Sequence, residues 1–195
     1  MPSDPTVQDV IDVALRVAAG LEQINVRYAL VGSLASSLQG EPRSTNDIDF
    51  VSVLSVEQIA SFAAALGEEF DIDEVALADS IRAGGSWNIY FLPLMTKIDL
   101  FALDSTELRR TQFSRAMPAR IGNRTINVLR PDDTILSKLL WYRDGGGVSD
   151  QQWRDVLGVL RVSGAQVDHA YLDEWASRLG IELLLARARK EARIP

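Results

Sequence analysis

Three aspartates with apolar neighbours form the clearest chemical pattern in the sequence. Asp47 and Asp49 stand two residues apart, and Asp99 follows in a later segment, where it alternates with Lys97 and Phe101. Successive side chains of a β-strand point to opposite faces, so a strand through Asp47 and Asp49 presents both carboxylates on one side. Neighbouring carboxylates repel unless a cation lies between them, and hard oxygen ligands favour Mg²⁺ or Mn²⁺. With Asp99 on a neighbouring strand, the three carboxylates could hold two divalent ions, and we predict a metal site there.

The spacing of the aspartates is not specific by itself. With 27 acidic residues in 195 positions, about four acidic-x-acidic triplets are expected by chance. The chain contains three, and one of them, Asp71 with Asp73, lacks both a preceding Gly-Ser turn and a clear strand. This triplet is therefore an internal comparison for the pair at Asp47 and Asp49.

A turn at Gly32-Ser33 is the second candidate part of a site. It follows the apolar residues Leu30 and Val31 and precedes a short helical pattern. Glycine lets the backbone approach a ligand closely, and the N–H groups at a helix start, with the Ser33 hydroxyl, suit a phosphate group. Serine is also a favoured helix cap, so a purely structural turn is the alternative.

The composition argues against several classes of protein. The chain has no cysteine and one histidine, His169, which excludes disulfides and thiolate metal sites and disfavours Ser-His-Asp hydrolases and multi-histidine metal sites. No apolar run approaches the roughly 20 residues of a membrane-spanning helix. The first residues are acidic where a secretory signal is basic. We therefore expect a cytoplasmic protein with no membrane partner and with any metal on oxygen ligands.

Charge is distributed unevenly along the chain. Residues 1–108 contain 17 acidic and 5 basic residues, whereas residues 109–195 contain 10 acidic and 15 basic ones. Six arginines fall in one stretch without an acidic residue, namely Arg109, Arg110, Arg115, Arg120, Arg124 and Arg130. Such a stretch could bind an anion such as RNA, or it could simply be a set of solvated arginines.

Hydrophobic periodicity predicts an α/β (α+β) chain in which helices gather at the end. Helices are expected over residues 6–24, 33–38, 55–66, 105–115, 131–142, 149–162, 168–179 and 182–193, and strands over 27–31, 47–53, 87–92, 96–102, 120–121 and 125–129. Ser55 and Gln58 form a capping-box pattern, Asp104 or Ser105 is the expected cap of the next helix, and Gly122-Asn123 indicates a hairpin. Residues 71–85 fit neither period.

The order Val-Gly-Ser, thirteen residues, Asp-x-Asp and then an apolar-flanked Asp resembles the DNA-polymerase-β-type nucleotidyltransferase superfamily. The resemblance implies a mixed sheet with flanking helices and the transfer of a nucleoside monophosphate from an NTP to a hydroxyl, with pyrophosphate leaving. It also implies that Gly32 and Ser33 contact the triphosphate. Asp47 and Asp49 would bind the metals, and Asp99 would complete the metal site and help to deprotonate the acceptor.

The helical end resembles the corresponding part of AbiEii-like and MenT-like nucleotidyltransferases. The residues that carry this likeness are Arg130 to Leu139, Trp141-Tyr142-Arg143 and Gln152-Trp153-Arg154-Asp155. Those families include toxins of toxin–antitoxin systems, some of which add nucleotides to tRNA ends. The likeness implies that Lys138 lies toward the NTP phosphates with Asp155 as a polar partner.

Structural interpretations of these helical residues stay open beside the functional ones. Lys138 could instead reach solvent along its helix, and Asp155 is expected to lie at a helix surface or to support a neighbouring site residue. Trp141 and Trp153 are expected in the core between helices.

We therefore predict a nucleotidyltransferase α/β domain at 1–130, followed by a helical segment at 131–195 that closes over the cleft. The acceptor is predicted to be RNA (tRNA) or protein, with a cognate antitoxin as a further partner. One alternative is a small-molecule acceptor such as an aminoglycoside or lincosamide, because a cationic acceptor suits the acidic first half. The second alternative is a catalytically silent nucleotide-binding module, against which the three intact aspartates argue.

Overall fold

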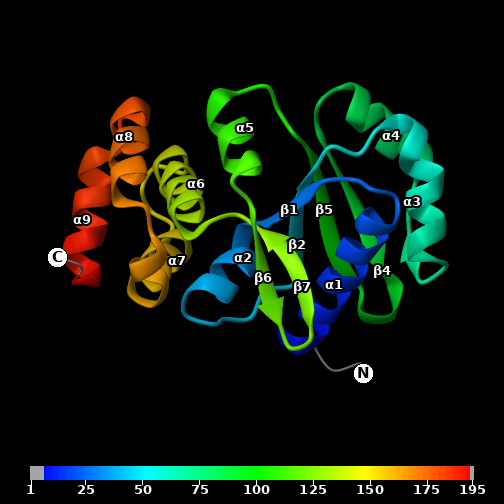
Figure 1. The fold of residues 1–195 in the computed structure, drawn as a ribbon, viewed down its shortest axis with the longest axis horizontal. Coiled ribbons are helices and arrows are strands. Elements are labelled where there is room, and N and C mark those ends of the chain that lie inside the picture. Colours follow the sequence, from blue (N-terminus) through cyan, green and yellow to red (C-terminus); the bar gives the residue numbers. More distant parts are fainter. Residues whose placement is uncertain (1–6, 194–195) are drawn as a thin grey trace. The chain divides into compact units, whose positions relative to one another are not determined.

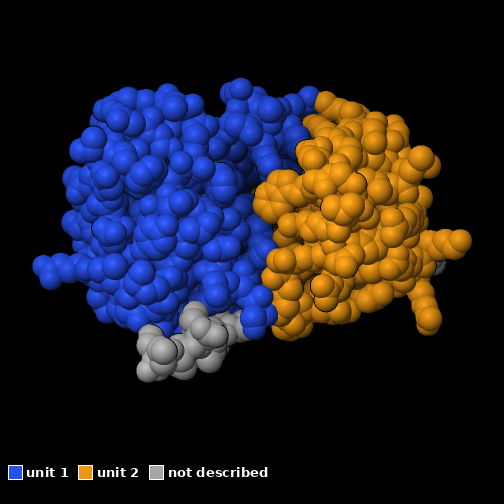
Figure 2. Space-filling model, turned by 180° about the vertical axis from the view of Figure 1, so that it is seen from behind, with its two compact units in different colours: residues 1–34, 44–128 blue, residues 35–43, 129–195 orange. Residues whose placement is uncertain are grey.

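A computed structural model describes residues 7–193 of the chain. These residues form two compact units, coloured separately in Figure 2. Unit 1 comprises the chain up to residue 34 together with residues 44–128. Unit 2 comprises residues 35–43 and the chain from residue 129 onward. The segment 35–43 therefore belongs to the helical unit although it lies between two parts of the sheet unit in sequence.

Unit 1 contains all the strands of the described chain (Figure 1). Its elements are α1 (Val7–Gln23), β1 (Tyr28–Val31), the start of α2 (Gly32–Gln39), β2 (Asp47–Ser52), η1 (Val56–Gln58), α3 (Ile59–Leu66), β3 (Phe70–Asp71), α4 (Glu74–Arg82), β4 (Ser86–Phe91), η2 (Leu92–Leu94), β5 (Thr96–Ala102), α5 (Glu107–Ser114), β6 (Met117–Ile121) and β7 (Arg124–Val128). The seven strands form one sheet in the order β3-β4-β5-β2-β1-β7-β6. The pairs β2–β5 and β1–β7 are parallel and the others antiparallel, so the sheet is mixed, as predicted.

One face of the sheet is built from apolar side chains that alternate with polar ones. Ile48 and Phe50 on β2, Ile98 on β5 and Ile89 on β4 are all fully buried. Helices α1, α3 and α4 cover this face, and Leu77 of α4 lies beside Leu100 of β5. The alternation leaves the aspartates of β2 and β5 on the opposite face, which these helices do not cover.

Unit 2 contains the end of α2 with the loop that follows it, and the remaining helices. These are α6 (Pro131–Asp144), α7 (Asp150–Ser163), η3 (Gly164–Gln166), α8 (His169–Leu179) and α9 (Glu182–Ala192). The loop packs closely on α7, since a Cβ added to Gly40 would lie 2.7 Å from the Val159 backbone nitrogen. The Ser163 hydroxyl donates to the Gln39 carbonyl oxygen at 2.5 Å. None of the helices in residues 7–193 is long and apolar enough to cross a membrane.

Most predicted elements are confirmed within two to four residues of their expected ends. The Ser55 capping box forms, because the Ser55 backbone N–H donates to the Gln58 side-chain oxygen at 3.1 Å. The expected cap at Asp104 or Ser105 is wrong: Thr106 caps α5, and Asp104 accepts from Thr106 instead. Residue 6, the predicted first residue of the first helix, lies outside the described residues.

Candidate functional site

The three predicted site aspartates lie on two neighbouring parallel strands. In the register of β2 and β5, Asp49 is paired with Asp99 and Asp47 with Lys97. Paired residues of adjacent strands share a face, and so do residues two apart on one strand. Asp47, Asp49, Lys97 and Asp99 therefore lie together on one face of the unit 1 sheet, and we call them the carboxylate cluster.

Lys97 supplies the positive charge of this cluster. Its Nζ lies 2.9 Å from Asp99 Oδ2 and 3.7 Å from Asp47 Oδ1. The hydrogen bond to Asp99, with the charges of the three aspartates, holds the pKa of the Lys97 ammonium group above its usual value although partial burial opposes this. Sequence reasoning placed Lys97 on the face of Asp99 but gave it no role. The signal was its two-residue spacing from Asp99 on a strand.

The predicted turn at Gly32 lies directly against the cluster. Gly32 begins α2 with φ of +68°, and a Cβ built on it would lie 1.9 Å from Asp49 Oδ2. A side chain at this position would therefore displace the Asp49 carboxylate. Ser33 follows in the first turn of α2, where backbone N–H groups lack partners within the helix. The two motifs, Gly-Ser and Asp-x-Asp, thus meet at one point of unit 1.

The donor chemistry of the carboxylate cluster fits a divalent cation. Three hard oxygen donors share a face, and the ammonium group of Lys97 already holds positive charge between two of them. Among residues 7–193, no three acidic or histidine side chains are gathered closely enough to ligate a single ion. Metal ligation by Asp47, Asp49 and Asp99 therefore stays a prediction.

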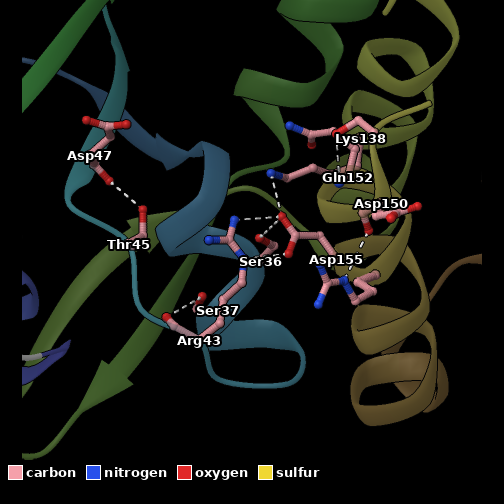
Figure 3. Close-up of polar contacts among 11 residues, drawn as sticks. Ser36, Ser37, Arg43, Thr45, Asp47, Lys138, Asp150, Gln152 and Asp155 are labelled. Atoms are coloured by element: carbon pink, nitrogen blue, oxygen red, sulfur yellow. Dashed lines mark hydrogen bonds and ion pairs between the residues drawn. The ribbon is translucent and has the colours of Figure 1, made fainter. Parts of the chain in front are cut away.

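A second cluster of charges lies in unit 2 around Asp155 of α7 (Figure 3). Arg43 donates from Nε to Asp155 Oδ1 at 2.8 Å and from Nη2 to Oδ2 at 3.0 Å. The Lys138 ammonium group of α6 lies 2.8 Å from Oδ2, and the Ser36 hydroxyl donates to the same oxygen at 3.2 Å. We call Ser36, Arg43, Lys138 and Asp155 the Asp155 cluster.

Two members of the Asp155 cluster are buried, whereas the side chain of Arg43 is 26% exposed. The side chains of Lys138 and Asp155 are 1% and 5% exposed. Burial alone raises the pKa of the Asp155 carboxyl, but hydrogen bonds from Arg43 and Lys138 outweigh it and hold that pKa below its usual value. Of the two structural interpretations of Asp155, the helix-surface position is wrong, because two cations compensate the cost of burying its charge, and the support of a neighbouring site residue stays a prediction. Lys138 likewise does not reach solvent along its helix.

Sequence reasoning missed Arg43 and Ser36. Both lie in the segment 35–43, where the hydrophobic pattern gives a short helix and a polar loop with no sign of a partner. Arg43 is 112 residues from Asp155 in sequence. Only the packing of the loop on α7 brings the two side chains together.

The two tryptophans next to this cluster differ in environment. Trp153 is buried, as predicted, and its indole N–H donates to Glu191 at 3.0 Å. Trp141 is 37% exposed, so its expected core position is wrong. Tyr142 instead fills the space between α6 and α7, with its ring 5.1 Å from that of Trp153.

One aspartate of the comparison triplet, Asp71 with Asp73, serves as a helix cap. Asp73 caps α4 by accepting from the backbone N–H groups of Val75 and Ala76, so its carboxylate has a structural role.

In the β6–β7 hairpin, Arg120 is paired with Thr125 and Arg124 with Ile121. These pairs are adjacent in the ladder, so the two arginines project to opposite faces of the hairpin.

Comparison with known proteins places the fold. No family model and no curated protein matches the chain. Among solved structures, the antibiotic-resistance factor ANT(2'')-Ia is similar at 13% identity, with a TM-score of 0.54 over 88% of this chain and 95% of that one. An antigenic nucleotidyltransferase-like protein from Paracoccidioides brasiliensis is similar at 17% identity, with a TM-score of 0.55 over 96% of this chain and 95% of that one. These likenesses confirm the predicted nucleotidyltransferase fold.

Proposed function

We propose that this chain uses its nucleotidyltransferase fold to transfer a nucleoside monophosphate from an NTP to an acceptor hydroxyl, with Mg²⁺ or Mn²⁺. The observation that carries the proposal is the carboxylate cluster: Asp49 is paired with Asp99, Asp47 shares their face, and Gly32 lies against Asp49. Acidic groups beside a glycine turn at a helix start combine donors for a cation with N–H groups for a phosphate.

Each of these residues would have its own part in the transfer. Asp47 and Asp49 would hold the metal, and the backbone N–H groups of Gly32 and Ser33 would contact the triphosphate. The acceptor oxygen bonds to the α-phosphorus as the bond to the β-phosphate oxygen breaks, and pyrophosphate carries away the electron pair. Asp99 would orient the acceptor hydroxyl and take its proton. When bound, the divalent ion neutralises charge on the phosphates.

The resemblance of the helical end to AbiEii-like and MenT-like nucleotidyltransferases implies that Lys138 would bind the NTP phosphates, which requires its ammonium group, 1% exposed in this structure, to become accessible to them. A lysine ammonium group is a compact point charge that suits phosphate oxygens.

Two classes of acceptor have support from separate observations. RNA or protein, as in the AbiEii-like and MenT-like toxins with their antitoxin partners, has the support of the arginines between Arg109 and Arg130. The opposite orientations of Arg120 and Arg124 weaken a single continuous track. A small molecule such as an antibiotic has the support of the structural likeness to an antibiotic-resistance factor.

Labelling tests the proposed function directly. The protein would be incubated with each of the four α-³²P-labelled NTPs, Mg²⁺ and a cell extract that is then fractionated. We expect one NTP to label a defined fraction, and Asp49→Asn to abolish the labelling. Binding of an NTP without labelling of any fraction would instead support the silent nucleotide-binding module.

Salt dependence then distinguishes the acceptor classes. With three or four phosphate contacts, raising salt from 50 to 200 mM should weaken binding of RNA by roughly 20- to 150-fold, because each contact releases a counterion. A triple variant in which Arg115, Arg120 and Arg124 are each changed to Ser should show a weaker salt dependence of RNA binding and unchanged NTP binding. Salt-insensitive binding of the acceptor would contradict an RNA acceptor and favour the small-molecule alternative.

A further inference from the structure

Strand pairing in unit 1 places four residues in one row across the sheet, on the face of the carboxylate cluster. The row begins with Val31 of β1, which is paired with Asp49 of β2. Asp49 is paired with Asp99 of β5, and Asp99 in turn is paired with Asn88 of β4. Paired residues share a face, and neighbouring strands lie about 4.8 Å apart. Asn88 is therefore next to Asp99, on the side away from Asp49.

The two ends of this row differ in chemistry. Gly32 follows Val31 and begins α2, whose first N–H groups suit a phosphate, and a Cβ built on Gly32 would lie 1.9 Å from Asp49 Oδ2. At the other end, the exposed side chain of Asn88 offers an amide that can both donate and accept hydrogen bonds. The row thus leads from groups for a phosphate, through ligands for a cation, to an uncharged polar group.

The geometry of phosphoryl transfer assigns a substrate to each end. The attacking and leaving oxygens lie roughly in line, on opposite sides of the phosphorus. With the triphosphate on Gly32 and Ser33, pyrophosphate leaves on the β1 side, and the acceptor hydroxyl approaches from the side of β5. Asp99 lies on that side, as its proposed role in taking the proton requires. The groups of the acceptor that do not react would then lie over β4.

Tyr90 is a second side chain of β4 on this face. It is half-buried, is paired with Lys97, and stands two residues after Asn88, so the three side chains lie on the same face. A tyrosine ring can contact a cationic group of a ligand, and its hydroxyl can form a hydrogen bond. Together, Asn88 and Tyr90 give this side of the site an amide, a hydroxyl and an aromatic ring.

The charges around β4 favour a cationic acceptor over a polyanion. No residue of β4 is basic, and the ammonium group of Lys97 on β5 is held by Asp99 and Asp47. Arg120 and Arg124 lie on β6 and β7, at the opposite edge of the sheet. Three carboxylates outweigh one ammonium group in the carboxylate cluster, and an NTP bound with its magnesium ions adds no net positive charge. This side of the site therefore attracts an amino group and repels a phosphate.

We propose that Asn88 and Tyr90 bind the acceptor, and that the acceptor is a small hydroxyl compound that carries at least one amino group. The inference rests on the proposed function and names the substrate class of the same site. The Asn88 amide would hydrogen-bond to a group beside the reacting hydroxyl, and the Tyr90 ring would contact the protonated amino group. Both residues determine which acceptor binds and take no part in NTP binding.

Two trisaccharides that differ only in charged groups test the substrate class. The β-1,4-linked trimer of glucosamine carries an amino group on each sugar, where cellotriose carries a hydroxyl, and a short single-stranded RNA is the polyanionic probe. Each would be titrated into the ¹⁵N-labelled protein with Mg²⁺ and each of the four NTPs as its α,β-methylene analogue, while backbone amide signals are followed by NMR. We expect the glucosamine trimer to shift the signals of residues 86–91 and to bind at least about fivefold more tightly than cellotriose. RNA should leave these signals unchanged.

Variants of β4 test the two residues. Asn88→Ala removes an exposed side chain and should weaken binding of the glucosamine trimer about fivefold, because a hydrogen bond is lost. Tyr90→Leu should have a similar effect, and Tyr90→Phe, which keeps the ring, a smaller one. NTP affinity with Mg²⁺, measured calorimetrically, should stay within about twofold in all three variants.

Asn123→Ala is the matched control. Asn123 is also an exposed asparagine, in the turn between β6 and β7 at the opposite edge of the sheet. Its loss should leave the affinity for the glucosamine trimer within about twofold of the wild type, as for other surface substitutions.

The possible results separate this inference from the proposed function. If NTP binds to the wild type but the glucosamine trimer does not, or binds no more tightly than cellotriose, the inference is overturned and the proposed function stands. The same holds if the trimer binds Asn88→Ala and Tyr90→Leu as tightly as the wild type, or if RNA binds and Asn88→Ala weakens it. If the folded wild type binds none of the four NTPs, the proposed function fails, and this inference fails with it.

Discussion

The carboxylate cluster and the Asp155 cluster contain the same kinds of groups in opposite proportion. The first has three carboxylates around one ammonium group, and the second has one carboxylate between a guanidinium and an ammonium group. Their exposure also differs, since Asp47 is 59% exposed and Asp155 only 5%. A cation held by accessible carboxylates can be replaced by another cation from solvent. The partners of a buried ion pair are not replaced in this way, and removing one of them strongly lowers the free energy of unfolding.

The two clusters are therefore suited to different functions. The carboxylate cluster sits on strands and is suited to a metal and a reacting hydroxyl. The Asp155 cluster joins the loop after α2 to helices α6 and α7, and it fixes the orientation of Lys138. Variants in the first cluster should therefore affect chemistry most, and variants in the second should affect folding and affinity.

Apart from the variants of the two metal-binding aspartates, the largest effect is expected for the residue assigned to the attacking hydroxyl. Asp99→Asn should lower the transfer rate by roughly 10²- to 10⁴-fold, because proton transfer to a positioned base is lost. NTP affinity should stay within about tenfold of the wild type, since Asp99 acts mainly on the acceptor. Single-turnover kinetics and NTP titration measure the two quantities. Equal losses in rate and affinity would place Asp99 in nucleotide binding instead.

The next largest effect is expected on stability in unit 2. Asp155→Ala leaves Arg43 and buried Lys138 without their shared carboxylate and should lower the free energy of unfolding by about 3–5 kcal/mol. Urea unfolding measures the loss. Asp144→Ala is the control, because its pair with Arg143 is exposed and should contribute less than about 1 kcal/mol. Similar losses in both variants would contradict the comparison.

The stabilisation by Asp155 should also depend on pH. The folded-state pKa of this carboxyl lies below its unfolded value of about 3.9. Its contribution is therefore fully present above that value and is lost as the pH falls through the lower folded pKa. Asp155→Asn should flatten the acid side of the stability profile below about pH 4, whereas an unchanged profile would show that the carboxyl titrates normally.

A smaller effect is expected where the two motifs of unit 1 meet. Gly32 and Gly84 both have positive φ, but only at Gly32 would a Cβ meet another side chain, that of Asp49. Gly84→Ala should cost about 1 kcal/mol for its backbone conformation, and Gly32→Ala should cost at least about 2 kcal/mol. Thermal unfolding compares the two. Equal costs would show that Asp49 moves aside freely.

Most of the fold could be predicted from sequence because it depends on local patterns. Alternation over residues 47–53 predicted a strand with one polar face, observed as β2 (Asp47–Ser52), and Gly122-Asn123 predicted the hairpin. The hydrophobic pattern predicted neither a helix nor a strand over residues 71–85, because β3 is only two residues long and α4 is weakly amphipathic.

The site was predictable only in part, for a related reason. Asp47, Asp49 and Asp99 are brought together by strand pairing, which follows from alternation on neighbouring strands. The pairing of Arg43 with Asp155 depends on tertiary packing of a polar loop on a helix, which no local period encodes. Tyr142 rather than Trp141 lies in the core, and this likewise depends on how α6 is rotated against α7.

The smallest effect, a change in melting temperature, is expected for substitution of Lys97, the cation of the carboxylate cluster. Lys97 is 34% exposed, and a divalent ion bound by the same carboxylates would compete with it. Lys97→Met should therefore lower the melting temperature by about 2–4 °C without metal, and Mg²⁺ should raise it by more than in the wild type. Exposed Lys190→Met is the control. An identical Mg²⁺ response in all three proteins would mean that Lys97 does not occupy the cation site.

The central claim is that Asp47 and Asp49 hold the metal on which transfer depends. Its most direct test is Mg²⁺-dependent transfer from labelled NTP by Asp47→Asn, Asp49→Asn and the comparison variant Asp71→Asn, whose aspartate lies on β3 outside the cluster. We predict that the first two lose at least about 10³-fold in rate and bind NTP more weakly with Mg²⁺, while Asp71→Asn retains both properties. Equal loss in Asp71→Asn, or full activity in Asp47→Asn and Asp49→Asn, would contradict the claim.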